Sequence, residues 1–343
     1  MTDLRELTFA EIESLAAKAL ISSNVSIENA WAVARSIAAA ERDGQAIVGL
    51  SYLPTYCDHA ACGKVDGHAR SHLENLSPAV LRVDAATGFA HPAIVLGLQP
   101  LAEAARKNGI AALSVGNSYA CGSLGYFVEE LAQQGLIALM AANASPSIAP
   151  FGGKTPFFGT NPLAFGVPRE GREPLVIDQS SSVVAKVAVI DAYNRGVALP
   201  DGWAIDADGV PTNDAAAAMG GSLLPIGGYK GFGLALVVDI LAAGLTRSHW
   251  SFEASSFGDC EGGPPRTGQL IIALDPKVFA GAGFAARLEL MLSAAQEAPA
   301  VRLPGDRRIE TRRKHGTAIQ VPATVVETVE RYTREGSPHA LKG

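Results

Sequence analysis

The chain has 343 residues, of which 48% are hydrophobic and 18% are charged. This balance excludes a disordered protein, because enough apolar surface exists to offset the entropy cost of ordering a large core. At about 150 residues per domain, the length suggests roughly two domains. The net charge of −6 would repel a phosphate backbone, so nucleic-acid binding is not expected.

Three features favour a cytoplasmic protein with no membrane span. The longest apolar stretch, Gly231 to Leu245, contains Asp239 and is too short to cross a bilayer core of about 30 Å. No basic segment followed by an apolar one opens the chain, so no signal peptide is expected. The cysteines form no C-x-x-C pair and are too sparse for a disulfide framework: Cys57, Cys62, Cys121 and Cys260.

The first 76 residues predict two helices and a connection. Thr8 and Glu11 form a capping-box pattern before a helix over 9–21. Ser26 is placed to cap a second helix that ends by Gly44. The polar stretch 63–76 is expected to be a surface connection.

From Val80 onward, short apolar runs alternate with helical segments, which predicts α/β packing in mixed α+β layers. The stretch 146–168 is rich in Pro, Gly, Ser and Thr and is expected to form functional-site loops. The expected elements are helices 92–107, 124–133, 229–245 and 280–295, strands 110–115, 136–141, 174–178 and 269–274, and a strand or helix start at 183–190.

Several common motifs are absent or weak. The run 152–155 resembles a phosphate loop, but Ile148 stands where that motif needs a glycine, and no G-x-G-x-x-G follows a predicted strand. His68 and His72 lie in a polar loop, so no metal site is predicted. Ser180 to Ser182 suit phosphate contacts better than a hydrolase nucleophile. The basic cluster at 302–314 fits either a phosphate site or a solvated tail.

Six segments together resemble the type-2 malate/L-lactate dehydrogenase family, in the family's order and over nearly the whole chain. They are Ile148–Lys154, Phe158–Phe165, Leu199–Asp206, Leu223–Gly231, Gly268–Pro276 and Val301–Arg307. The opening Ala40-Glu-Arg-Asp-Gly44 is most similar to the branch that reduces Δ1-piperideine-2-carboxylate and Δ1-pyrroline-2-carboxylate.

The resemblance implies a non-Rossmann NAD(P)H-binding fold with an α-helical N-terminal part. It also implies a homodimer whose active sites lie at the subunit interface, and hydride transfer to a C=O or C=N carbon beside a carboxylate. NADPH is expected, with NADH as the alternative. The implied division is a helical part at 1–60, a dimerisation and substrate domain at 61–120 and 296–343, and an NAD(P)H-binding domain at 121–295.

The resemblance also assigns residues. Thr160 matches the position that hydrogen-bonds the substrate carboxylate. The positions that match the family's cofactor contacts are Gly122, Ser123, Leu124, Asp178, Gln179, Ser180, Lys186, Val187, Lys230, Pro304, Gly305, Asp306, Arg307 and Arg308.

The proton relay of the family is replaced in this chain. Where the family has Ser-His-Gly, this sequence has Ile47, Val48 and Gly49, and Tyr52 stands at the arginine that grips the carboxylate. Ala188 replaces the relay aspartate, and Ala120 replaces a frequent histidine. The site is therefore expected to be dry and hydrophobic there.

This replacement favours an imine substrate. Loss of general-acid help typically costs a factor of about 100 to 10,000, and reduction of a ketone needs that help. A protonated imine brings its own proton and positive charge, so hydride transfer yields a neutral amine without a donor. We therefore predict reduction of the C=N bond of a cyclic iminium that enters the site already protonated.

Four residues are expected to shape the substrate pocket: Thr160, Val48, Tyr52 and Tyr56. If a donor is still needed, the candidates in order are Tyr119, Lys154 and Tyr52. Two alternatives stay open. One is a 2-oxo acid or 2-hydroxy acid oxidoreductase with a relocated acid, and the other is a non-catalytic dinucleotide-binding homologue.

Overall fold

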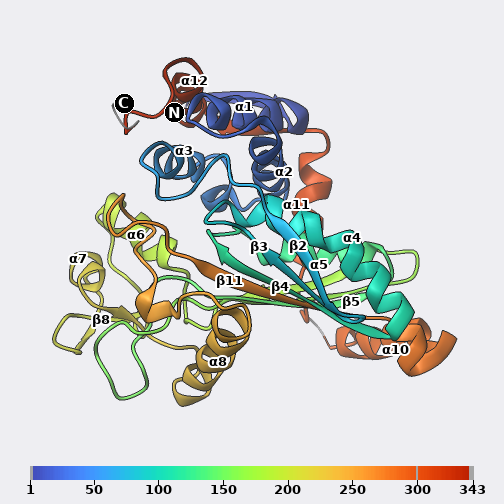
Figure 1. The fold of residues 1–343 in the computed structure, drawn as a ribbon. Coiled ribbons are helices and arrows are strands. Elements are labelled where there is room, and N and C mark those ends of the chain that lie inside the picture. Colours follow the sequence, from blue (N-terminus) through green and yellow to red (C-terminus); the bar gives the residue numbers. More distant parts are fainter. Residues whose placement is uncertain (1–2, 299, 340–343) are drawn as a thin grey trace.

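A seven-stranded mixed sheet forms the centre of the computed structural model, which describes residues 3–298 and 300–339 (Figure 1). β3 and β4 pair in parallel, and the other neighbouring strands pair antiparallel. The strands in spatial order are β2 (His72–Ser77), β3 (Val80–Asp84), β4 (Ile110–Ser118), β11 (Thr267–Leu274), β5 (Ile137–Ala142), β6 (Leu163–Val167) and β7 (Leu175–Gln179).

A helical layer built from both ends of the chain lies above this sheet in Figure 1. The capping box of Thr8 with Glu11 and the Ser26 cap both form, so the two predicted N-terminal helices are confirmed. The layer contains α1 (Phe9–Ser22), α2 (Ile27–Arg42), α3 (Leu53–Ala61), α12 (Ala323–Glu335) and the ribbon of β1 (Leu4–Thr8) with β12 (Ala318–Pro322).

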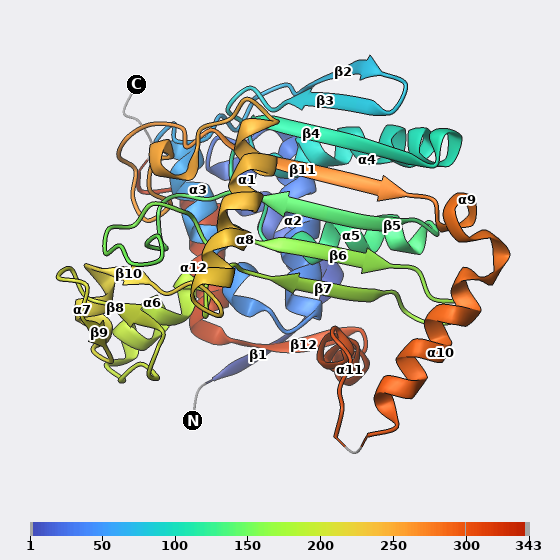
Figure 2. The same ribbon diagram turned by 90° about the horizontal axis from the view of Figure 1, so that it is seen from below.

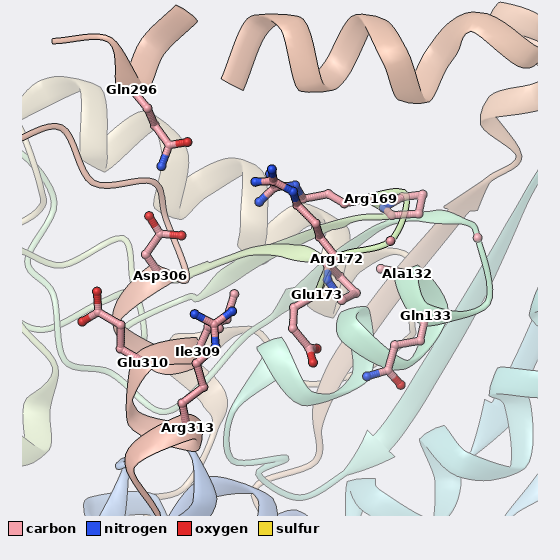
Figure 3. Close-up of a pocket in the computed structure, with 14 residues that line it drawn as sticks. Ala132, Gln133, Arg169, Arg172, Glu173, Gln296, Asp306, Ile309, Glu310 and Arg313 are labelled. Atoms are coloured by element: carbon pink, nitrogen blue, oxygen red, sulfur yellow. The ribbon is translucent and has the colours of Figure 1, made fainter. Parts of the chain in front are cut away.

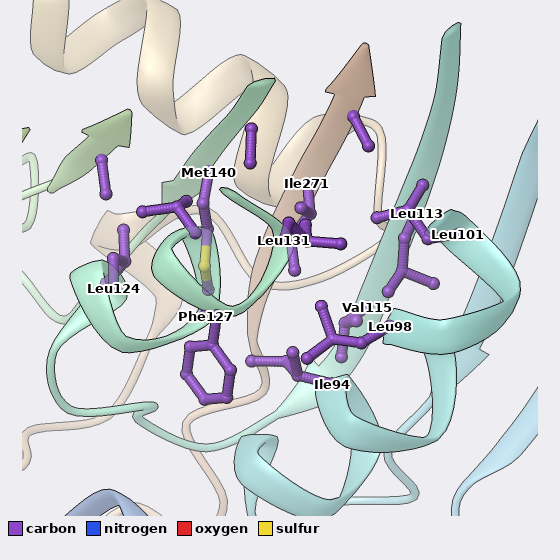
Figure 4. Close-up of a cluster of buried hydrophobic side chains, with 14 of the residues drawn as sticks. Ile94, Leu98, Leu101, Leu113, Val115, Leu124, Phe127, Leu131, Met140 and Ile271 are labelled. Carbon is purple, nitrogen blue, oxygen red and sulfur yellow. The ribbon is translucent and has the colours of Figure 1, made fainter. Parts of the chain in front are cut away.

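Helices cover both faces of the sheet (Figure 2). α4 (Ala90–Asn108) and α5 (Leu124–Gln133) cover one face, and α8 (Tyr229–Asp239) with its π-helical continuation Ile240–Gly244 covers the other. Ile94, Leu98 and Phe127 belong to the buried cluster between α4, α5 and the strands (Figure 4). Each such side chain contributes about 1.5–3 kcal/mol to folding.

A small lobe with its own buried cluster projects beside the sheet (Figure 2). It contains β8 (Ala204–Ile205), β9 (Pro211–Thr212), β10 (Ser222–Leu223), α6 (Lys186–Arg195) and α7 (Ala215–Met219). The remaining helices are α9 (Pro276–Ala280), α10 (Phe284–Gln296), α11 (Asp306–His315) and the 3₁₀ turns Ala46–Val48, Ser251–Glu253 and Gly281–Gly283.

Some sequence expectations need correction. The expected connection 63–76 contains the edge strand β2, whose side chains are mostly exposed and therefore look like a loop. The expected loops 146–168 include β6. At 183–190, where a strand or a helix start was expected, the helix start is confirmed, because α6 begins at Lys186. The sheet also runs across the domain boundary expected at residue 120, since β4 and β5 both pair with β11.

The cysteine expectation is also wrong for one pair, because Cys62 and Cys260 form a disulfide. The partners are separated by 198 residues along the chain, and only the tertiary fold brings them together. This cross-link fastens the loop after α8 to the end of α3.

One further segment has the length and hydropathy of a membrane span. Pro276–Gln296 has 21 residues and a mean hydropathy of 1.4. It is two helices joined at Gly281, which has a φ of +64°. The longer helix has 13 residues, which at 1.5 Å per residue is about 20 Å and shorter than a bilayer core.

Candidate active site

A cavity of about 180 Å³ lies where the helical layer meets one end of the sheet. Its walls come from the start of α3, the loop before α5, and the loops that follow β5 and precede β6. The lining residues are Val48, Tyr52, Tyr56, Ala120, Cys121, Gly122, Leu124, Ala142, Asn143, Ala144, Thr160, Pro162, Val187, Phe257 and Gln269.

The four residues expected to shape the substrate pocket all line this cavity: Val48, Tyr52, Tyr56 and Thr160. Ala120, which stands at a relay position, lines it too. Within the described residues, no hydrogen bond uses the Thr160 hydroxyl, while its carbonyl accepts one from the Ser181 amide at 2.8 Å. The Thr160 side chain is therefore free to bind a ligand oxygen.

The cavity wall is electrically neutral. None of its lining residues is Asp, Glu, Lys, Arg or His. The amide of Asn143 is already engaged with the His249 carbonyl and the Gly268 amide, and Gln269 accepts from Ser118. A ligand carboxylate in this cavity would depend on Thr160 and backbone N–H groups rather than on an ion pair.

Buried Glu41 fixes the segment that carries Val48 and Tyr52. Its carboxylate accepts a hydrogen bond of 2.7 Å from the Leu50 amide. A Cβ at Gly49 would lie 2.3 Å from a Glu41 oxygen, so this contact requires glycine there. The pKa of Glu41 is raised by burial.

Tyr119 does not line the cavity, which corrects its expected place as the first candidate donor. Its side chain is fully buried, and its hydroxyl is hydrogen-bonded to His59 Nδ1. Tyr52 and Tyr56 do line the cavity, and their rings pack edge-on with centroids 4.9 Å apart.

Lys154 is not supported as a relocated acid. Its side chain is exposed in the small lobe beside Gly209, and it is absent from the cavity wall. The Ser222 hydroxyl donates to its backbone carbonyl at 2.8 Å.

Some of the expected cofactor residues lie at the same cavity. Gly122, Leu124 and Val187 line it. Asp178 caps the start of α5, accepting from Ser123 Oγ at 2.9 Å and the Gly125 amide at 2.7 Å. A Cβ at Gly125 would meet Asp178 and Arg308 at 3.2 and 3.3 Å, so the two segments approach closely at this glycine.

The two neighbouring arginines of the basic cluster differ in environment. Arg308 is half-buried in an ion network in which Arg312 binds Glu129 at 2.6 Å and Asp43. Arg307 is exposed at the start of α11. A planar guanidinium of this kind can bind a phosphate group through two hydrogen bonds. The donors present are therefore compatible with NADPH.

The remaining expected cofactor contacts lie on adjacent segments. The turn before Lys230 is attached to the serine run, because the Ile226 amide donates to the Ser181 carbonyl at 2.9 Å. The serine prediction needs correction, since Ser181 and Ser182 are buried and donate to the carbonyls of Asn161 and Val184. Exposed Lys186 begins α6, and Gln179 ends β7.

A larger groove of about 990 Å³ lies at the other end of α5 (Figure 3). Its charged groups are mixed, with Arg169, Arg172 and Arg313 facing Glu173, Asp306 and Glu310. Arg169 is held by Glu289 at 2.7 Å. Of the expected cofactor residues, this groove includes Asp306, and the balance of charge does not favour an anionic substrate.

Sequence reasoning did not anticipate Phe257, Asn143, Gln269 or His59 at the site. Phe257 comes from a loop held by the Cys62–Cys260 disulfide and packs edge-on to Tyr119 at 5.1 Å. Asn143 directly follows β5, Gln269 lies within β11, and neither belongs to a local motif. His59 lies on the α3 face opposite solvent, and its helical spacing from Tyr56 was the available signal.

Comparison with known proteins identifies the class. The model of the malate/L-lactate dehydrogenase family matches residues 7–330. The chain therefore belongs to this family of oxidoreductases.

Two enzyme relatives cover almost the whole chain. A (2R)-3-sulfolactate dehydrogenase (NADP(+)) of Chromohalobacter salexigens is 44% identical over 96% of this chain and 98% of that protein. A Δ1-pyrroline-2-carboxylate/Δ1-piperideine-2-carboxylate reductase of Pseudomonas syringae pv. tomato is 39% identical over 91% of this chain and 92% of that protein.

Solved structures agree with the fold expectation. The Δ1-piperideine-2-carboxylate reductase of Pseudomonas syringae superposes with a TM-score of 0.90 at 38% identity, covering 96% of this chain and 99% of that one. A dehydrogenase of Sinorhizobium meliloti gives a TM-score of 0.87 at 28% identity, covering 97% and 99%. The predicted non-Rossmann family fold is confirmed.

Proposed function

We propose that this oxidoreductase uses NADPH to reduce the C=N bond of a cyclic imine that carries a carboxylate. The observation that carries the proposal is the neutral cavity wall. Val48 and Ala120 stand at relay positions, and none of the lining residues is Asp, Glu, Lys, Arg or His. An iminium ion needs no proton from such a wall, because it is already protonated.

NADPH, when bound, supplies the hydride. The residues of the chain bind the substrate, orient it and exclude water. The free Thr160 hydroxyl donates to the substrate carboxylate, and the faces of Tyr52 and Tyr56 attract a cationic ring. Val48, Ala120 and Phe257 exclude water, which strengthens both interactions. Orientation of the substrate by these contacts lowers the barrier without a proton transfer.

The relatives support this substrate class. Proteins named Δ1-pyrroline-2-carboxylate reductase, some of them also named for the piperideine, are 36–39% identical to this chain over at least 89% of its length. The NADP(+) in the name of the sulfolactate relative and the exposed Arg307 support NADPH.

One observation favours a second candidate, the oxidation and reduction of a 2-hydroxy acid and its 2-oxo acid. The sulfolactate dehydrogenase is 44% identical, which exceeds the identity to the imine reductases. In that reaction the Tyr52 hydroxyl would donate to the oxygen that receives negative charge.

A cofactor-oxidation assay separates the two candidates. Purified protein is given NADPH with Δ1-piperideine-2-carboxylate, Δ1-pyrroline-2-carboxylate or pyruvate, and NADP⁺ with (2R)-3-sulfolactate. The proposal expects the largest kcat/KM with one of the cyclic imines. A larger kcat/KM with pyruvate or sulfolactate would reverse the order, and tight NADPH binding without any turnover would favour a non-catalytic homologue.

We also propose a homodimer with the active site at the subunit interface. Large apolar side chains are exposed along α10 and along α8 with its continuation, namely Leu290, Met291, Leu236, Val237 and Ile240. Such patches mark association surfaces. Analytical ultracentrifugation tests this assembly.

A cytoplasmic location stays a proposal. The Cys62–Cys260 disulfide weakens it, because the expected lack of disulfides was one of the arguments for that location.

A further inference from the structure

Asn161 lies directly behind the cavity wall, between the lining residues Thr160 and Pro162. Its side chain is fully buried, and its φ of +40° falls in the left-handed region. Asparagine adopts this region more readily than most residues, but a residue that precedes a proline favours an extended backbone. The surrounding contacts must therefore hold the chain in this conformation.

The side-chain amide of Asn161 fastens this part of the wall to α8. Its Nδ2 donates to the Ala235 carbonyl at 2.9 Å, one turn before the π-helical continuation of that helix. Its Oδ1 lies 3.1 Å from the Ser251 hydroxyl, which lies 2.8 Å from Asp239 Oδ1 on the same helix. Because a carbonyl only accepts hydrogen bonds, Ala235 determines which end of the amide faces α8.

Ser181 holds the backbone of the same segment. Its amide donates to the Thr160 carbonyl at 2.8 Å, and its hydroxyl donates to the Asn161 carbonyl at 2.7 Å. Ser181, Ser251 and Asp239 are all buried, so these bonds form out of contact with solvent. The segment is thus attached to α8 on one side and to the loop after β7 on the other, which fixes the direction of the Thr160 side chain.

We propose that Asn161 and Ser181 are positioning residues that direct the Thr160 hydroxyl at the carboxylate of the substrate. The inference rests on the proposed function, in which Thr160 binds that carboxylate. None of the residues that line the cavity is Lys or Arg, so binding depends on a hydrogen bond rather than on an ion pair. A hydrogen bond weakens steeply when its angle departs from linear, whereas the attraction between two charges depends on their distance. A rigid backbone at Thr160 is therefore needed for this neutral cavity to bind a carboxylate.

The test compares Asn161→Ala with a matched control, Asn29→Ala. Asn29 is also buried, and its Nδ2 donates to the carbonyls of Gly67 and Ala69 at 3.0 Å, but it lies on α2 and is not among the residues that line the cavity. Both substitutions remove buried hydrogen bonds and lower the unfolding temperature. In Asn161→Ala, the KM for a cyclic imine with a carboxylate rises about 10-fold, while kcat and NADPH affinity stay within about 2-fold. Asn29→Ala keeps the wild-type KM. An equal rise in both variants would show that the KM follows stability and would overturn the inference.

A double variant shows whether Asn161 acts through Thr160. Thr160→Val removes the hydroxyl that Asn161 directs, so adding Asn161→Ala to Thr160→Val should change the KM by less than about 2-fold. Independent effects would instead multiply, and a KM about 100-fold above that of the wild type would contradict the proposal. An imine without a carboxylate should be reduced equally well by the wild type and by Asn161→Ala, and unequal reduction would also count against it.

Two further variants keep the test decisive if Asn161→Ala does not fold. Asn161→Gly adopts a positive φ without strain but lacks the amide, so it should raise the KM as Asn161→Ala does. Ser181→Ala removes the hydroxyl that holds the Asn161 carbonyl, so it should raise the KM about 3-fold. A wild-type KM in Asn161→Gly would overturn the assignment of Asn161, and a wild-type KM in Ser181→Ala would overturn that of Ser181.

The two proposals fail separately. If the wild type reduces cyclic imines and Thr160→Val raises the KM, while Asn161→Gly and Ser181→Ala do not, only the inference falls. If the wild type leaves every cyclic imine unreduced, the proposed function falls and takes the inference with it.

Discussion

Glu41 accepts a hydrogen bond from the Leu50 amide at 2.7 Å, and this contact ties α2 to the segment that ends at Tyr52. Glu41→Ala would leave the Leu50 N–H unpaired in a buried place, which costs about 1–3 kcal/mol of unfolding free energy. It would also release Val48 and Tyr52, so the KM for the imine should rise. Urea unfolding and steady-state kinetics measure the two effects.

Glu41→Gln is the matched control, because its amide oxygen can still accept from Leu50. It is expected to stay within about 1 kcal/mol of the wild type. Equal losses in the Ala and Gln variants would show that the carboxylate charge, rather than the hydrogen bond, holds the segment.

Thr160 provides the free hydroxyl of the cavity. Thr160→Val keeps the shape and removes the donor, and a hydrogen bond to a charged group is worth about 1.5–3 kcal/mol. We therefore expect the KM for a cyclic imine with a carboxylate to rise about 10-fold or more, with NADPH affinity unchanged. Thr160→Ser should restore most of the loss. An imine without a carboxylate should be reduced equally by wild type and Thr160→Val, and an unequal result would contradict the assignment.

The sequence is informative wherever a local pattern decides the structure. The Thr8 capping box, the Ser26 cap and the apolar stripes of α4 and α5 each specify a helix through neighbouring residues. β2 and the β1–β12 ribbon could not be predicted in this way. β2 is a mostly exposed edge strand, and β1 pairs with a segment more than 300 residues away.

The site residues also fall into two groups, those that sequence motifs could place and those that only tertiary contacts bring to the site. Val48, Tyr52, Tyr56 and Thr160 could be placed together because the family motifs carry their spacing. Phe257 and His59 reach the site through contacts between α3 and the loop after α8, and the Cys62–Cys260 pair depends on the same contact. No local pattern encodes such a contact. Lys154 looked suitable by composition, but its turn belongs to the small lobe.

Substitution of Arg307 should affect cofactor binding, whereas substitution of Arg312 should affect the stability of the fold. Arg307→Met removes an exposed guanidinium, so we expect the KM for NADPH to rise about 10-fold while the KM for NADH and the unfolding free energy stay the same. Arg312→Met would leave Glu129 and Asp43 without their main partner, at a cost of about 3–5 kcal/mol. Exposed Arg313 provides the control variant, Arg313→Met. A destabilised Arg307→Met protein would contradict this division.

The thiols give a direct chemical test of the loop that carries Phe257. Titration of the denatured, unreduced protein should find two thiols, Cys57 and Cys121, and reduction should reveal Cys62 and Cys260 as well. Cys62→Ser with Cys260→Ser should lower the unfolding free energy by about 2–4 kcal/mol and raise the KM for the imine. Four thiols in the unreduced protein would show that the loop is held by noncovalent contacts such as Lys64 with Glu261.

His91 should make the protein less stable as the pH falls. It is buried under Gly122, where burial lowers its pKa to about 4 from the ordinary 6.5. Between these values the unfolded chain binds a proton that the folded chain does not, so stability is full above pH 6.5 and falls towards pH 4. The slope is about 1.4 kcal/mol per pH unit for this one group.

His91→Gln should flatten the pH dependence of the unfolding free energy measured in urea, whatever its effect at neutral pH. Exposed His72→Gln is the control and should keep the wild-type slope. His59 adds a contribution of the same sign, and Glu41, whose pKa is raised, opposes both, so the difference between variant and wild type isolates His91. Parallel curves for His91→Gln and the wild type would mean that this imidazole is protonated in the folded protein.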